Sequence, residues 1–130
     1  MPAYIVMGAQ WGDEGKGKII DVLAERMDIV IRFQGGANAG HTVIHGETRY
    51  VTHLIPSGVI SGNSINIIGN GCVVNPATLL EEMDTLQKQG VNISPDKFII
   101  SPAAHMVLPV HQYLDKILNE KIGTTVRGIG

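Results

Sequence analysis

The 130-residue sequence has little of what would link a protein to an oxidising compartment, a membrane or a nucleic acid. Cys72 is the only cysteine, so an intramolecular disulfide is excluded and a reducing compartment is expected. No apolar run approaches the length of a membrane-spanning helix, and no basic or apolar leader opens the chain. Aromatic residues make up 5% and the net charge is −2, which argues against base stacking and bulk attraction to DNA or membranes. We therefore expect a soluble cytoplasmic protein that binds neither nucleic acid nor membrane.

Glycine is abundant, and the most informative segment is the glycine-rich stretch Gly8–Lys18, with the sequence GAQWGDEGKGK. It lies between an apolar run, predicted to be a strand at residues 3–8, and a helical pattern. The order strand, glycine-rich turn and helix directs backbone N–H groups and a helix N-terminus towards phosphate. Lys16, flanked by Gly15 and Gly17, is placed to reach a terminal phosphate, as the lysine of a P-loop does.

This loop differs from the common P-loop in its spacing and in its metal ligand. Six residues instead of four separate Gly8 from the pair Gly15 and Lys16, and Gly17 stands where a Ser or Thr that binds magnesium is expected. A loop without that hydroxyl needs another oxygen ligand for the metal, and Asp13 is the obvious candidate. The alternative interpretation of Asp13 is an exposed carboxylate that caps the following helix.

The alternation of strand and helix patterns predicts a three-layer α/β fold with a mostly parallel sheet, similar to P-loop NTPases but with a variant phosphate loop. Residues 28–31 are expected to pair in parallel with residues 3–8 as a β-α-β unit. The other expected elements are a hairpin of residues 42–45 and 49–53, a strand at 65–68 with a turn at Gly69–Gly71, a helix from Asn75–Pro76 to Gly90 with the apolar face Leu79, Leu80, Met83 and Leu86, a strand at 98–100, and a helix with apolar positions between Val110 and Leu118.

A second loop of small residues, Gln34–Thr42, follows the predicted strand 28–31. In open α/β sheets, ligands bind at the carboxyl ends of strands, so this loop is a candidate for ligand binding. His41 follows Asn38, Ala39 and Gly40 and is expected to face the ligand, although a histidine near a strand end is more often structural. Asn38 has the alternative of a turn residue. The residues without a partner spaced for metal binding are interpreted as structural: His45, His105, His111 and Cys72.

Four motifs taken together resemble the adenylosuccinate synthetase family. They are QWGDEGKGK at residues 10–18, QGGANAGHT at 34–42, HLIPSG at 53–58, and IGTT with RGIG at 122–130. The resemblance covers the chain in order, but the family's chains are several times longer. We therefore interpret residues 1–130 as the N-terminal part of a single larger catalytic domain that binds GTP and IMP. Val126 departs from the family pattern, which usually has glycine there, and a β-branched residue is disfavoured at positive φ.

The resemblance implies a GTP-dependent ligase of purine biosynthesis that joins inosine monophosphate (IMP) to L-aspartate and makes adenylosuccinate on the route to AMP. The purine O6 attacks GTP phosphate once the N1 proton has been removed, and aspartate then displaces phosphate from the 6-phosphoryl intermediate. The resemblance also implies one Mg²⁺ per site and a homodimer of the complete protein.

Residue roles follow from the same resemblance. Asp13 is the expected base for the N1 proton and a Mg²⁺ ligand, His41 the second catalytic residue, and Gly40 a Mg²⁺ ligand through its carbonyl. The residues implied for GTP are Gly12, Asp13, Glu14, Gly15, Lys16, Gly17, Gly40, His41 and Thr42. Those implied for IMP are Asp13, Lys16, Asn38, Ala39, Gly40, His41 and Thr125. His53 belongs to a mobile loop in the family, and a packing role for it is equally open.

Two other classes of function remain as alternatives. A P-loop GTPase or phosphotransferase would need a hydroxyl after the loop lysine and a separate acid on a later strand, and neither is found in the sequence. A nucleotide-binding fragment without catalysis is the second alternative. An assay of the isolated chain against a longer protein separates this alternative from the ligase.

Overall fold

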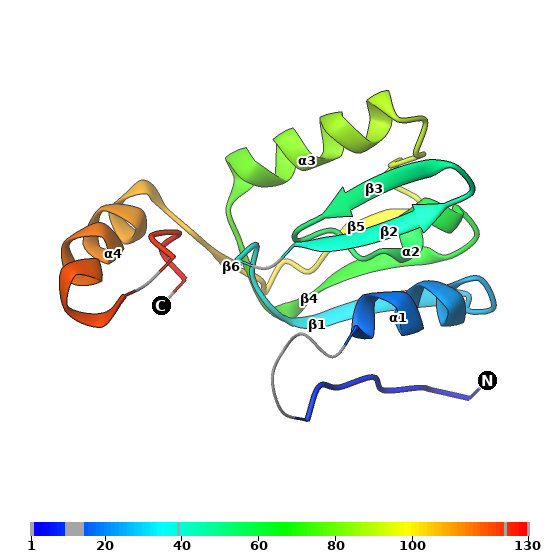
Figure 1. Cartoon of the computed structure of the whole chain (residues 1–130), viewed down its shortest axis with the longest axis horizontal. Coiled ribbons are helices and arrows are strands. Elements are labelled where there is room, and N and C mark those ends of the chain that lie inside the picture. Colours follow the sequence, from blue (N-terminus) through cyan, green and yellow to red (C-terminus); the bar gives the residue numbers. More distant parts are fainter. Residues whose placement is uncertain (1, 10–14, 39, 124, 130) are drawn as a thin grey trace.

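The computed structural model describes residues 2–9, 15–38, 40–123 and 125–129. The helices and strands follow the chain in this order (Figure 1): α1 (Lys16–Ala24), β1 (Ile29–Gly35), β2 (His41–His45), β3 (Thr48–Thr52), α2 (Gly58–Ser61), β4 (Ile65–Val74), α3 (Pro76–Lys88), β5 (Phe98–Ile100), β6 (His105–Met106) and α4 (Pro109–Ile122).

The main sheet is parallel, and β4 is its central strand. β1 pairs with β4 along its length, from Ile29 opposite Ile65 to Gly35 opposite Cys72. β5 pairs with the first half of β4 on the other side, and β6 pairs with the last two residues of β4. The prediction of an α/β fold with a mostly parallel sheet is confirmed.

The predicted turn at Gly69–Gly71 is wrong, because β4 continues through both glycines. A Cβ atom at Gly71 would lie 2.4 Å from the carbonyl oxygen of Phe33, and one at Gly69 would lie 3.0 Å from that of Arg32. The register between β1 and β4 shifts at the same place. These glycines therefore allow two backbones to approach closely at an irregular part of the ladder, rather than reversing the chain.

Residues 2–9 form no strand, so the prediction of a β-α-β unit is wrong in its first strand. The segment is drawn out in Figure 1, and the side chains of Tyr4, Ile5 and Met7 are 60%, 79% and 69% exposed. An apolar run favours extended chain, but a strand also needs a backbone partner. Among the residues that the structure describes, no ladder includes this segment.

Helix α3 begins where its local chemistry predicted. The side-chain oxygen of Asn75 accepts hydrogen bonds from the N–H groups of Ala77 (3.0 Å) and Thr78 (3.4 Å), and Pro76 occupies the first turn. Gly90 follows the helix with a φ of +87°, a left-handed conformation that glycine adopts readily. Both predicted ends of this helix are confirmed.

One face of α3 packs into the core. Leu79 and Leu86 are buried there, but Leu80 is 64% exposed, so its predicted place on the apolar face is wrong. Glu82 lies between the two buried leucines and is itself only 8% exposed. The core that this face shares with the sheet and the 54–59 segment contains Ala37, Leu54, Ile55, Val59, Ile68, Cys72, Val74, Leu79, Leu86, Val91, Ile93 and Phe98.

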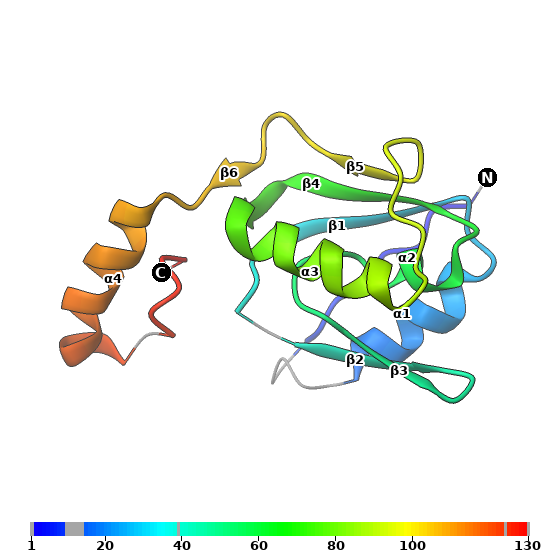
Figure 2. The same ribbon diagram turned by 90° about the horizontal axis from the view of Figure 1, so that it is seen from above.

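Strands β2 and β3 form the predicted antiparallel hairpin, with His41 opposite Thr52 and His45 opposite Thr48. Gly46 in its turn has a φ of +61°. Figure 2 shows the hairpin together with α1 and α3 on one side of the main sheet. The hairpin therefore carries His41 over the sheet, on the side where α1 begins.

The opposite side of the sheet is apolar and accessible. We call it the outer sheet face; it comprises Ile29, Ile31, Phe33 and Ile99, which are 42% to 56% exposed. Ile31, Ile67 and Ile99 stand side by side in the register of β1, β4 and β5. Helices α1 and α3 thus lie on the side opposite to the outer sheet face.

Helix α4 confirms the last predicted helix, but it extends away from the sheet in Figures 1 and 2. Its apolar side chains are between 46% and 65% exposed: Val110, Tyr113, Leu114, Ile117 and Leu118. Within the described residues, no helix is both long and apolar enough to cross a membrane.

Candidate nucleotide site

The end of the glycine-rich loop forms the beginning of α1. Gly15 is the N-cap residue and has a φ of +78°, a left-handed conformation that a residue with a side chain seldom adopts. Lys16 is the first residue of the helix and is half-buried. The first N–H groups of a helix have no partner within it and carry a partial positive charge, which suits phosphate. The predicted site residues Gly12, Asp13 and Glu14 lie outside the described residues.

Strand β2 brings His41 to the beginning of α1. A Cβ atom built on Gly17 would lie 3.7 Å from both Cβ and Nδ1 of His41. A methyl group at position 17 would therefore be in ordinary van der Waals contact with His41. Two motifs that are 24 positions apart in the sequence (41 − 17) meet here, as the phosphate-loop hypothesis requires.

The pKa of His41 lies below its ordinary value. Burial is the main cause, because it disfavours the charged ring. Nearby charges contribute less: Arg32, Lys16 and His53 lower the pKa, and Glu82 raises it. A ring held neutral at neutral pH has one N–H donor and one acceptor nitrogen, and can exchange a proton with a bound group.

The small-residue loop is buried at Gly36 and Ala37 and accessible nearer to β2. Asn38 lies in a turn and is exposed, as are Gly40 and Thr42. Gly40 faces His53, since a Cβ atom on it would lie 3.3 Å from Cε1 of that imidazole. Ala39 lies outside the described residues, and the ligands of this loop remain predictions.

Arg32 of β1 is a charged residue that the sequence analysis did not single out. Its guanidinium donates hydrogen bonds to the carbonyl oxygens of His53 and of Gly36, the latter through Nη2 at 2.7 Å. The side chain therefore ties the small-residue loop to the segment after β3. An arginine in the middle of an apolar strand was the available signal.

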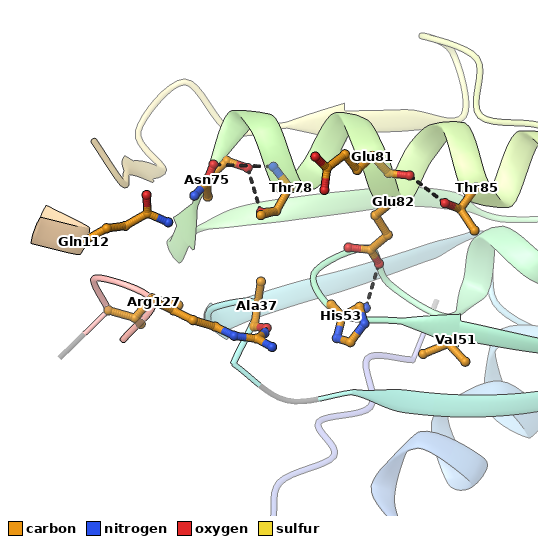
Figure 3. A pocket seen from close by; sticks show the side chains of 11 residues that line it. Ala37, Val51, His53, Asn75, Thr78, Glu81, Glu82, Thr85, Gln112 and Arg127 are labelled. Atoms are coloured by element: carbon orange, nitrogen blue, oxygen red, sulfur yellow. Dashed lines mark hydrogen bonds between the residues drawn. The ribbon is translucent and has the colours of Figure 1, made fainter. Parts of the chain in front are cut away.

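Glu82 of α3 is the second charged residue that was missed. Its carboxylate accepts hydrogen bonds from three successive backbone N–H groups, those of His53 (2.7 Å), Leu54 (3.0 Å) and Ile55 (3.1 Å). Figure 3 shows the carboxylate directed towards His53. The signal for Glu82 was its position on the apolar face of a helix, where a carboxylate needs polar partners.

The C-terminal loop lies against the small-residue loop. The guanidinium of Arg127 donates a hydrogen bond to the carbonyl oxygen of Ala37, and a Cβ atom on Gly36 would lie 2.8 Å from Cδ1 of Ile129. The N–H group of Gly128 donates to the buried carboxylate of Asp115 at 2.7 Å. The two motifs predicted to contact IMP therefore adjoin each other.

A cavity of about 450 Å³ lies between these loops and α3. Ala37, His53, Glu82 and Arg127 line it, together with Asn75 and Gln112 (Figure 3). Its volume is within the range of small-molecule sites. Thr125 is exposed, but it is not among the residues that line the cavity. Thr125 is two positions before Arg127, which does line the cavity. The contact of Thr125 with IMP remains a prediction.

Val126 adopts the conformation that its side chain disfavours. Its φ is +55°, in the left-handed region, and it is the one non-glycine residue with positive φ among the residues described. A β-branched residue there is strained by roughly 1–3 kcal/mol. The departure from the family pattern is thus accompanied by strain at Val126.

We expect the substitution Val126→Gly to stabilise the fold by about 1 kcal/mol, because relief of strain exceeds the added entropy of the unfolded chain. Thermal unfolding followed by circular dichroism measures this as a higher Tm. Val51→Gly is the matched control: Val51 lies in strand β3 with no positive φ, and its loss should lower the Tm. If the Val126→Gly variant were less stable than the unsubstituted chain, this would contradict the claim that Val126 strains the loop.

Two of the four residues that were interpreted as structural, His111 and Cys72, make hydrogen bonds within the fold. Nδ1 of His111 accepts a hydrogen bond from the N–H group of Leu108 at the start of α4. Cys72 is buried, its Sγ donates to the carbonyl oxygen of Arg32, and burial raises the pKa of its thiol. Within the described part of the chain, no group of three His, Cys, Asp or Glu side chains could hold a metal ion.

A model of the adenylosuccinate synthetase family matches residues 5–130. The chain belongs to the adenylosuccinate synthetase family. Adenylosuccinate synthetases of Clostridium botulinum strain Hall and Clostridium beijerinckii are 56% and 55% identical to it, over 100% of this chain and 32% of each relative. The chain thus spans about a third of the length of these relatives.

Two solved structures of synthetases have the same fold. The fully ligated adenylosuccinate synthetase of Plasmodium falciparum matches with a TM-score of 0.83 and 46% identity, over 95% of this chain and 30% of that one. A succinoaminodeoxyadenylate synthetase of cyanophage S-2L, bound to dGMP and dATP as an energy donor, matches with a TM-score of 0.68 and 25% identity, over 91% and 33%. The resemblance to the adenylosuccinate synthetase family, which the sequence motifs indicated, is therefore confirmed.

Proposed function

We propose that this chain forms the N-terminal part of a GTP-dependent ligase that joins IMP and L-aspartate to give adenylosuccinate. Family membership supports the class of reaction. The observation that carries the proposal is the contact between Gly17, in the first turn of α1, and His41 at the start of β2. It joins a helix N-terminus suited to phosphate to an imidazole whose pKa lies below its ordinary value.

In this proposal, Lys16 and the N–H groups at the start of α1 bind the GTP phosphates, and His41 donates a hydrogen bond or proton there as charge develops. Asp13 removes the N1 proton of IMP, so that O6 attacks the γ-phosphate of GTP and GDP leaves. The amine of aspartate then displaces inorganic phosphate from C6. Asn38 and Thr125 hold the IMP phosphate. The adjoining position of the loops that carry them, fixed by the bond from Arg127 to Ala37, supports this last pair.

We propose Mg²⁺ at the carbonyl of Gly40 and the carboxylate of Asp13. Gly40 fits, because it is exposed and because its neighbour His41 lies at the start of α1, where phosphates would bind. Oxygen donors are what Mg²⁺ prefers. When bound, the ion would neutralise phosphate charge, and the chain's own contribution is to hold Gly40 in place through its contact with His53.

We further propose that the complete protein is a cytoplasmic homodimer. The single, buried cysteine is compatible with a reducing compartment. The accessible apolar side chains of the outer sheet face and of α4 provide surface for further chain or for a second subunit. Sedimentation velocity of the complete protein measures the dimer.

A chimeric synthetase tests the function. It joins residues 1–130 of this chain to the two thirds of the Clostridium botulinum enzyme that lie beyond the matched part. With GTP, IMP, aspartate and Mg²⁺, we expect a rise in absorbance from adenylosuccinate at a rate within about tenfold of the parent, since typical kcat values span about 1–10³ s⁻¹.

The same chimera separates the ligase from its alternatives. A folded chimera that hydrolyses GTP without IMP would indicate a simple GTPase, and one that binds GTP in calorimetry without turnover would indicate a nucleotide-binding module. Replacing IMP and GTP by dGMP and dATP, the ligands of the cyanophage structure, tests the other substrate pair. Preference for that pair would overturn the proposed substrates but not the class of reaction.

A further inference from the structure

The segment His53–Ile55, directly after β3, is held on its two backbone sides by two charged groups, the buried Glu82 and the half-buried Arg32. We propose that Glu82 and Arg32 are positioning residues, which place the imidazole of His53 against Gly40 and beside His41 so that both rings serve one phosphate site. The role of this site in binding phosphate rests on the proposed function. The arrangement of Glu82, Arg32 and His53 rests on the described residues alone.

The N–H side of the segment is held by Glu82. Three successive N–H groups converge on one carboxylate at 2.7 to 3.1 Å, with the N–H group of His53 making the shortest contact. Hydrogen bonds to a charged acceptor are the stronger kind, and this carboxylate is almost fully buried. Such convergence fixes the direction in which the backbone leaves β3, and therefore the position from which the His53 side chain starts.

The carbonyl side of the segment is held by Arg32. Its planar guanidinium reaches the carbonyl oxygen of His53 with Nη1 and that of Gly36 with Nη2. A rigid fork with two donors fixes the distance between the two acceptors. The segment after β3 is thus set relative to the small-residue loop that leads to Gly40 and His41.

These two contacts leave the His53 side chain at the cavity and not in the core. Leu54 and Ile55 are each 1% exposed, whereas His53 is half-buried and lines the cavity of about 450 Å³. Its ring lies 3.3 Å from the position of a Cβ on Gly40. Gly40 directly precedes His41, so the position of His53 beside Gly40 brings its ring to the backbone that carries His41.

The plain alternative is that Glu82 only stabilises the fold by giving partners to three buried N–H groups. Both interpretations predict a local loss of order when the carboxylate is removed. They differ in the effect of Glu82 on catalysis through His53. A purely structural residue and His53 should have independent effects, whereas a positioning residue loses its effect once His53 is gone.

Hydrogen exchange tests the geometry in the 130-residue chain without any activity measurement. The substitution Glu82→Gln keeps the shape but removes the charge and turns an N–H donor towards backbone N–H groups. We expect the amides of residues 53–55 to exchange at least about tenfold faster, with those of β4 unchanged. Asp84→Asn, an exposed acid on the same helix that pairs with Lys88, is the matched control and should leave all of them unchanged.

A double-mutant cycle in the chimeric synthetase tests the role. We expect Glu82→Gln to lower kcat by roughly 10- to 100-fold with a smaller change in the KM of aspartate, since a displacement of about 1 Å can cost that much. His53→Asn should cause a comparable loss. The double variant should be no more than about threefold worse than the poorer single variant.

The outcomes separate this inference from the proposed function. An unsubstituted chimera without ligase activity contradicts the proposed function, and accelerated exchange of residues 53–55 would still support the geometry. An active chimera in which the two losses multiply, or in which Glu82→Gln has the kcat of the unsubstituted protein, overturns the positioning role. Unchanged exchange of residues 53–55 in Glu82→Gln overturns the clamp itself.

Discussion

The substitution Asp13→Asn in the chimeric synthetase is expected to lower kcat by roughly a hundredfold or more. The amide keeps the size of the side chain but cannot accept the N1 proton of IMP, so O6 remains a weak nucleophile. The amide oxygen is also a weaker ligand for Mg²⁺ than a carboxylate. The weaker Mg²⁺ ligand should raise the KM of GTP, but by less than the loss in kcat, because the GTP contacts of Lys16 and of the start of α1 are untouched.

Initial rates at saturating GTP, IMP and aspartate measure this effect. Asp28→Asn is the matched control, because Asp28 is an exposed acid just before β1, and its variant should keep the unsubstituted rate. A thermal unfolding curve shows whether each variant is folded. Unsubstituted kcat in a folded Asp13→Asn variant would show that the base is another residue.

The isolated 130-residue chain is expected to form no measurable adenylosuccinate. It spans about a third of the length of its relatives, and no role in recognising guanine or holding aspartate was predicted for its residues. Binding must offset the loss of translational and rotational freedom, about 4–15 kcal/mol, and phosphate contacts at one end of a nucleotide supply only part of that. We therefore expect weak GTP binding and no turnover.

The surface of the isolated chain adds a second expectation. The outer sheet face and the exposed side of α4 together present a large apolar area, and such areas promote association. Analytical ultracentrifugation should show oligomers that increase with concentration. Replacing Ile31 and Ile99 together by threonine should reduce that association, because both side chains belong to the accessible face.

Absorbance-monitored product formation and calorimetric GTP titration decide the first of these expectations. The chimeric synthetase, assayed in parallel, is the positive control. Robust turnover by the isolated chain, with intact synthetase from the expression host excluded by mass spectrometry, would show that the essential site is complete within these residues.

Features that depend on neighbouring residues could be predicted from the sequence. The start of α3 followed from Asn75 and Pro76, because capping uses atoms two or three positions apart. The hairpin turn followed from Gly46 in the same way. The motifs around Lys16 and His41 were also recognisable, since a phosphate loop is a local arrangement of backbone.

Features that depend on distant partners were predicted wrongly or were not predicted at all. The need for Gly69 and Gly71 arises from the backbone of β1, which no local pattern around them reveals. Residues 2–9 had the composition of a strand, but pairing is decided elsewhere in the fold. Glu82 binds amides 27 to 29 positions away, so only its unusual place on an apolar helix face could have indicated a role.

The pairing of β1 with β4 also has a consequence for synthesis on the ribosome. Ile29 pairs with Ile65, so 36 further residues (65 − 29) must be made before the ladder can begin. At about 5–20 residues per second, β1 waits for roughly 2–7 s with its Ile-Val-Ile-Arg-Phe run unpaired. Such a run is prone to aggregate, and Arg32 is the single charge within it. The residue that later ties two loops of the site together is thus also the one charge that opposes aggregation of this run.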